Sequence, residues 1–151
     1  MPNKKLIIIG DGSQMQKFKK LANENITLKG HLPRVEVIKY MSRAKVFVFM
    51  PKEDFGIVPI EAQACGTPVI AYGRGGAAET VVDINDSKTP TGVFVKEQKS
   101  SSLIQAVIEF EKNKSLIKPE YCLKNAKKFS VQRFKQEFKA LIEKKGNYEI
   151  L

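Results

Sequence analysis

Two glutamates bracket a short predicted turn that could bind a ligand rich in hydroxyl groups. Glu53 follows the apolar run 46–50, and Glu61 lies in a stretch of helix-compatible residues that ends at Gly66. The run of β-branched and aromatic residues predicts a strand, and the residues after Gly56 predict a helix. Carboxylates at such a turn accept hydrogen bonds from neutral hydroxyl groups. The first chemical hypothesis is therefore a site for a polyhydroxylated ligand.

The turn itself adds a place for an anion. Gly56 would let a ligand approach the backbone closely, because glycine has no side chain. The N–H groups of Ile57 and Val58 lie at the start of the predicted helix, where a diphosphate is favoured. Several hydroxyls and a diphosphate together describe a nucleotide-sugar. On spacing alone, solvated surface acids at Glu53 and Glu61 explain the pattern equally well.

Strands alternate with helices along most of the chain. The predicted strands cover residues 6–9, 26–28, 46–50, 68–71 and 92–95. Ser13 and Gln16 form a predicted capping box for the first helix, and two further helices follow the last strand, the second of them starting after Ser130. This alternation predicts the α/β class with a doubly wound, Rossmann-like parallel sheet, which binds ligands at the carboxyl ends of its strands.

The segment from Glu53 to Glu61 resembles the Glu-x7-Glu signature of the family-four retaining glycosyltransferases. The resemblance continues through residues 66–71, 75–80 and 90–94. It implies a GT-B fold, in which two Rossmann-like domains enclose the active site. The sequence of residues 53–66 is most similar to the corresponding segment of mannosyltransferases that use GDP-mannose. The resemblance therefore implies transfer of mannose to a glycan or a lipid-linked acceptor.

The resemblance also assigns roles to residues of the central turn. Glu53 would be the catalytic residue that holds hydroxyls of the donor sugar, and Glu61 would bind the ribose diol. The loop between them would bind the sugar and the phosphates, chiefly through backbone N–H groups, at Asp54, Phe55, Gly56 and Ile57. The family needs no metal and no cofactor, because cationic side chains and a helix amino end stabilise the leaving diphosphate.

Three residues outside the turn are candidates by the same resemblance. Gly30 and His31 follow a predicted strand at the position where the family's backbone lies beside the nucleobase. Arg74, in a glycine-rich loop, could meet phosphate, although a solvated surface arginine explains it equally well. Gly10-Asp11-Gly12 lacks the third glycine of a dinucleotide-binding motif, so a plain tight turn is the favoured interpretation.

Parts of the resembled family have no counterpart in this sequence. The family's carboxyl-terminal domain begins with another βα unit that supplies an arginine and a lysine to the diphosphate, and an acceptor domain precedes it. We therefore expect residues 1–151 to form a single Rossmann-like domain that belongs to an enzyme in its full-length form and is inactive by itself. A non-catalytic nucleotide-sugar-binding or interaction module is the alternative.

Charge raises a competing hypothesis. The 151 residues carry a formal net charge of +10, and basic domains often bind nucleic acid or anionic membranes. Neither a zinc finger nor a helix-turn-helix signature is present, so nucleic acid is the weaker alternative. Peripheral contact with anionic lipid fits an enzyme that elongates lipid-linked glycans. A location in the cytoplasm, with some chains at the inner face of the membrane, is expected.

Cysteine and histidine content argues against a disulfide framework and a zinc site. The sequence has two cysteines, Cys65 and Cys122, and one histidine. Neither cysteine belongs to a Cys-x-x-Cys pair. The apolar runs are also far shorter than the roughly 20 residues that span a bilayer. No metal is expected.

Overall fold

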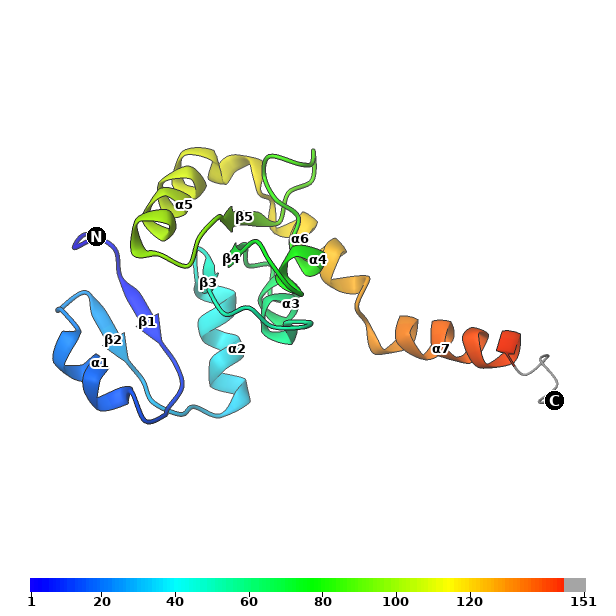
Figure 1. Cartoon of the computed structure of the whole chain (residues 1–151), viewed down its shortest axis with the longest axis horizontal. Helices are drawn as coiled ribbons and strands as arrows, with labels where there is room; N and C mark the ends of the chain where they lie inside the picture. Colours follow the sequence, from blue (N-terminus) through cyan, green and yellow to red (C-terminus); the bar gives the residue numbers. More distant parts are fainter. Residues whose placement is uncertain (146–151) are drawn as a thin grey trace. The chain divides into compact units, whose positions relative to one another are not determined.

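The computed structural model describes residues 1–145, and its chain divides into two compact units (Figure 1). The first unit is Met1–Ala44, and the second begins at Lys45. Each unit contains parallel strands connected through helices. The α/β class with parallel sheets, which the sequence predicts, is confirmed.

The first unit is a two-stranded parallel sheet with one helix after each strand. Its elements are β1 (Leu6–Ile8), α1 (Met15–Leu21), β2 (Ile26–Leu28) and α2 (Arg34–Arg43). Leu6 lies opposite Ile26 in the register of the two strands. The predicted capping box at Ser13 and Gln16 is wrong, because Gln14 is the N-cap of α1 and no side chain caps this helix.

The second unit contains a three-stranded parallel sheet in the order β3-β4-β5. Its strands and the helices between them are β3 (Phe47–Phe49), α3 (Ile57–Ala64), β4 (Val69–Tyr72), α4 (Ala77–Thr80) and β5 (Gly92–Val95). Because the strands are parallel, the turns that leave β3 and β4 start from the same edge of the sheet. This edge is the one at which open α/β sheets bind ligands.

β4 is the central strand, and its burial anchors the second unit. Val69, Ile70 and Ala71 are fully buried, as expected for a parallel strand covered on both faces. Ile70 belongs to a core cluster that includes Val93 of β5 and residues of the carboxyl-terminal helices. α3 packs against β3 and β4, so the sheet fixes the position of the helix that carries Glu61.

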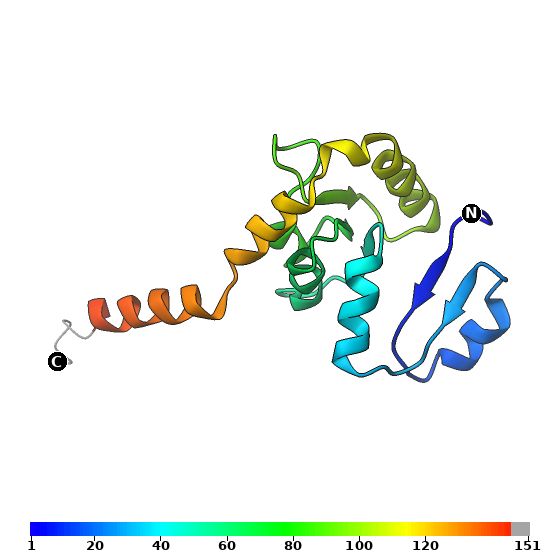
Figure 2. The same cartoon turned by 180° about the vertical axis from the view of Figure 1, so that it is seen from behind.

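Helices follow the last strand (Figure 2). They are α5 (Ser100–Asn113), the short 3-10 helix η1 (Lys114–Leu116), α6 (Pro119–Lys127) and α7 (Val131–Lys145). α6 was not predicted, although Pro119 at its first position is a recognised start signal. The predicted start of α7 after Ser130 is confirmed. The Ser130 hydroxyl oxygen accepts the Arg133 N–H at 3.3 Å.

The apolar face predicted for α7 is present but uncovered. Phe134 and Phe138 stack on one another with ring centroids 5.6 Å apart. Their exposed fractions are 66% and 51%, and Leu141 and Ile142 on the same helix are exposed as well. The periodicity therefore predicted the helix correctly, whereas no described residue buries its apolar side.

Both cysteines are free thiols. Cys122 is fully buried in the core, and burial raises the pKa of its thiol to about 11. Burial, with a smaller contribution from the Glu61 carboxylate, also raises the pKa of the Cys65 thiol. Both side chains are therefore neutral thiols near pH 7.

Among the described residues, none of the helices has the length and apolar character required to cross a membrane. Within the same part of the chain, no group of three or more histidine, cysteine, aspartate or glutamate side chains is arranged to hold a metal ion.

Candidate functional site

The turn between β3 and α3 has the strand-turn-helix conformation that the sequence predicts. Gly56 is the N-cap of α3 and is left-handed, with φ 75° and ψ 71°. This conformation is costly for residues with a side chain, so the turn requires glycine here. At the other end of α3, Gly66 has φ 77° and ends the helix as predicted.

The loop before α3 exposes its acidic and aromatic side chains. Glu53, Asp54 and Phe55 are exposed, whereas the Gly56 backbone is buried. Because the first N–H groups of a helix have no carbonyl partner within the helix, Ile57 begins a segment that can donate to an anion. The loop therefore combines carboxylates with a helix amino end.

Glu61 lies in the second turn of α3 and is half-buried. It is the fifth of the eight residues of α3, inside the stretch that the sequence predicts to be helical. Its carboxylate influences the nearby Cys65 thiol, whose pKa it helps to raise. A partly buried carboxylate can form stronger hydrogen bonds with a ligand than a fully solvated one can.

The glycine-rich loop after β4 supports the Glu53 loop directly. The Gly76 N–H donates to the Glu53 carbonyl oxygen at 2.7 Å. A side chain at Gly75 would place its Cβ 2.5 Å from the same oxygen, and one at Gly76 would overlap the Phe55 backbone. These two loops therefore form one surface, and glycine is required for their close approach.

A positive φ accounts for the need for glycine at only one of Gly75 and Gly76. Gly75 has φ 69°, whereas Gly76 has φ −59°, a conformation that any residue adopts. The sequence indicates a glycine-rich loop here but does not predict the close approach of Gly76 to the Phe55 backbone. A double glycine beside a strand end is the signal that could have indicated such an approach. Arg74 is exposed in this loop.

Phe55 contacts a residue that lies far from it in the sequence. Its ring meets that of Phe129 edge to face, with centroids 6.0 Å apart. Phe129 lies between α6 and α7, and the sequence analysis gave it no role at the turn. Separation by more than 70 residues leaves no local signal for such a pair, because periodicity describes single elements.

Gly30 and His31 lie in the first unit, just after β2. Gly30 has φ 65°, and His31 is exposed. The Gly30 carbonyl accepts the Gly10 N–H at 2.8 Å, which ties together the turns that follow β1 and β2. The turn favoured for Gly10-Asp11-Gly12 lies slightly later in the chain, at Ser13 and Gln14, where the Met15 N–H donates to the Gly12 carbonyl at 3.0 Å. Before it, the Asp11 carboxylate accepts the Gly12 N–H at 2.8 Å.

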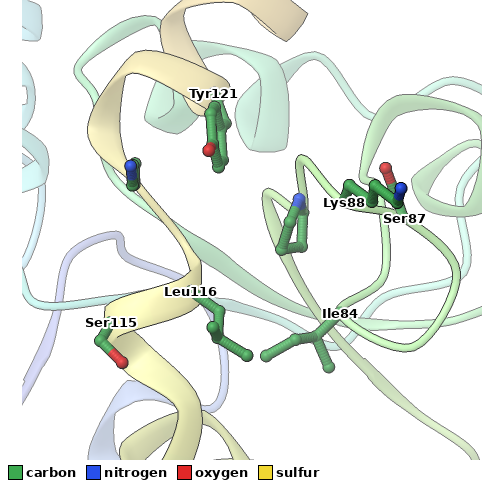
Figure 3. A pocket seen from close by; sticks show the side chains of 8 residues that line it. Ile84, Ser87, Lys88, Ser115, Leu116 and Tyr121 are labelled. Atoms are coloured by element: carbon green, nitrogen blue, oxygen red, sulfur yellow. The ribbon is translucent and has the colours of Figure 1, made fainter.

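A hollow of about 330 Å³ lies elsewhere in the second unit (Figure 3). It is bordered by the loop before β5 and by the segment around η1 and the start of α6. In Figure 3 the side chains of Ile84 and Leu116 point toward one another, and Tyr121 lies at the far side. None of the predicted site residues lines this hollow. At the β3–α3 turn, by contrast, the side chains from Glu53 to Phe55 are exposed.

Comparison with known proteins identifies the fold. A sucrose-phosphate synthase from Thermosynechococcus elongatus superimposes with a TM-score of 0.74 at 24% identity, over 93% of this chain and 38% of that one. HepE from Anabaena, solved in complex with UDP and glucose, gives a TM-score of 0.68 at 20% identity, over 98% and 42% of the two chains. The Rossmann-like fold of GT-B glycosyltransferases is thereby confirmed.

Sequence comparison identifies relatives with named activities. A GDP-mannose-dependent monoacylated alpha-(1-6)-phosphatidylinositol monomannoside mannosyltransferase from Corynebacterium glutamicum is 34% identical over 120 residues, which are 72% of this chain and 30% of that protein. An alpha-1,3/1,6-mannosyltransferase from Kluyveromyces lactis is 39% identical over 85 residues, 50% of this chain and 16% of that protein. The chain thus spans about a third or less of the length of these relatives.

The family assignment rests on most of the chain. Residues 1–129 match the family described as Glycosyl transferases group 1. This range includes the whole first unit and the second unit through α6, with the β3–α3 turn and the glycine-rich loop that supports it. The chain belongs to the group 1 glycosyltransferases.

Proposed function

We propose that this chain is the donor-nucleotide domain of a retaining glycosyltransferase. The observation that carries the proposal is the β3–α3 turn, in which left-handed Gly56 starts α3 between Glu53 and Glu61. An amino end of a helix suits a diphosphate, and the two carboxylates suit sugar and ribose hydroxyls. Few other ligands combine these two chemistries.

Each residue of the turn has a role in the proposal. Glu53 holds the hydroxyls of the donor sugar beside the reacting carbon, and Glu61 binds the ribose diol. The backbone from Phe55 to Ile57 donates to the sugar and the phosphates, with Asp54 at the rim of the loop. As the glycosidic bond to the diphosphate breaks, the sugar gains oxocarbenium character, as in glycoside hydrolysis. The helix amino end stabilises the negative charge of the leaving diphosphate.

The remaining assignments belong to the same proposal. Gly30 and His31 lie beside the nucleobase, and Arg74 meets phosphate. GDP-mannose is the proposed donor, and the activity named for the Corynebacterium glutamicum relative supports it. The proposed acceptor is a glycan or a lipid-linked glycan. The net charge of +10 supports peripheral contact of the whole protein with anionic lipid.

Calorimetric titration with GDP, UDP and inorganic diphosphate tests the proposal. We expect GDP to bind more tightly than diphosphate, because Glu61 and the base contacts act on the nucleoside. We also expect GDP to bind more tightly than UDP. Tighter binding of UDP would contradict GDP-mannose as the donor and leave the nucleotide-sugar domain in place. Equal binding of GDP and diphosphate would contradict the nucleotide site itself.

A further inference from the structure

Two buried amide side chains connect the helix of the candidate site to α6. Gln63 of α3 is fully buried, and Asn125 of α6 is 6% exposed. The Asn125 amide nitrogen donates to the Gln63 amide oxygen and to the Thr80 carbonyl, both at 2.8 Å. The Gln63 amide nitrogen donates to the same Thr80 carbonyl at 2.8 Å and to the Pro59 carbonyl at 3.2 Å. All four amide hydrogens therefore have acceptors.

The shared acceptor lies at the end of α4. Thr80 is the last residue of this four-residue helix, and the final carbonyls of a helix have no partner within it. Gln63 and Asn125 supply that partner from two other helices. They therefore fix the carboxyl end of α4 relative to both α3 and α6.

From Thr80 the hydrogen bonds continue to the candidate site. The Thr80 hydroxyl donates to the Gly76 carbonyl at 3.0 Å. The Gly76 N–H in turn donates to the Glu53 carbonyl at 2.7 Å. An uninterrupted series of hydrogen bonds and backbone thus runs from Asn125 to the loop that carries Glu53.

Stability alone is a weak reason for this arrangement. Burying two amides costs desolvation that apolar side chains of similar volume would avoid. Hydrogen bonds also fix the relative positions of the groups they join, because each one requires a defined donor–acceptor distance and angle. Fully satisfied polar networks in a low-dielectric interior specify a single arrangement of the elements they join. Here those elements are α3, α4 and α6.

We infer that Gln63 and Asn125 are positioning residues for the nucleotide-sugar site. They hold α4 so that Gly76 keeps the Glu53 loop at the correct distance from the amino end of α3. This inference rests on the proposed function for its ligand, a nucleoside diphosphate-sugar. It makes α6, which lies outside the glutamate signature, a structural component of the donor site.

Three variants of the whole chain test the inference. Asn125→Leu and Gln63→Met remove the donors to Thr80 while roughly preserving side-chain volume. Cys122→Ala is the matched control, because Cys122 is fully buried on the same helix and belongs to the core cluster instead. Thermal melts measure stability, and calorimetry measures GDP binding. Amide hydrogen exchange compares the exchange rate of the Gly76 N–H with that of the Val69 N–H of β4.

We expect Asn125→Leu to accelerate Gly76 exchange relative to Val69 and to weaken GDP binding about tenfold, the effect of losing one or two hydrogen bonds. Gln63→Met should give the same pattern, so the test does not depend on one variant folding. Cys122→Ala should lower the melting temperature while leaving the relative exchange and the GDP affinity unchanged at a temperature where the chain is folded.

Two results would overturn the inference. One is that Cys122→Ala changes the Gly76 exchange rate and the GDP affinity as much as Asn125→Leu does at matched stability. The amides would then contribute only to folding. The other is unchanged GDP affinity in folded Asn125→Leu and Gln63→Met. If the unmutated chain binds no GDP while Gly76 exchange responds as expected, the link to the loop stands and the proposed function fails.

Discussion

Gly56→Val is expected to abolish binding of GDP-mannose by the folded protein. Gly56 has φ 75°, and a Cβ there would make ordinary contacts with Pro59 at 3.7 Å and Phe49 at 3.8 Å. The valine methyls would extend beside the N–H groups that we assign to the ligand. The left-handed backbone also adds strain of about 1–2 kcal/mol, so stability will fall too. Saturation-transfer NMR with GDP-mannose measures binding, and thermal melts measure stability.

Gly66→Val provides the control for the strain. Gly66 has φ 77°, nearly that of Gly56, but it lies at the opposite end of α3. A Cβ there would lie 3.4 Å from Pro119, so we expect at least as large a loss of stability. Only Gly56→Val should lose binding in the folded fraction. Unchanged binding by folded Gly56→Val would mean that the sugar diphosphate lies elsewhere.

Glu61→Ala should weaken GDP binding far more than it disturbs folding. Loss of charge-assisted hydrogen bonds to a ribose diol costs about 1.5–3 kcal/mol, which is roughly a 10- to 150-fold rise in Kd. Titration calorimetry on both proteins measures the change. Glu120→Ala is the control, because Glu120 is an exposed carboxylate in the first turn of another helix, α6. Equal affinities of Glu61→Ala and the unmutated chain would remove Glu61 from the site.

Local signals predicted the β3–α3 turn well. A run of aromatic and β-branched residues before Gly56 and helix-forming residues after it determine the strand and the helix over a few positions. The start of α7 was predicted for the same reason, since Ser130 is a favourable capping residue. The boundary of α1 was wrong by one residue, because the N-cap is Gln14 and no side chain caps this helix.

Contacts between distant segments could not be predicted. Gln63 and Asn125 are 62 residues apart, and a glutamine within a helix gives no sign of its partner. Its spacing of four residues from buried Pro59 indicates only that it shares the buried side of α3. Likewise, the apolar period of α7 predicts a face to be buried but does not identify the surface that buries it.

A titration with GDP, followed by backbone amide NMR, tests directly whether the β3–α3 turn is the donor site. We expect the largest shifts at residues 53–61 and at Gly75 and Gly76, the two loops that form one surface. Residues 84–90 and 115–121 around the separate hollow should show small shifts. Shifts concentrated around that hollow, or none at saturating GDP, would contradict the assignment of the β3–α3 turn as the donor site.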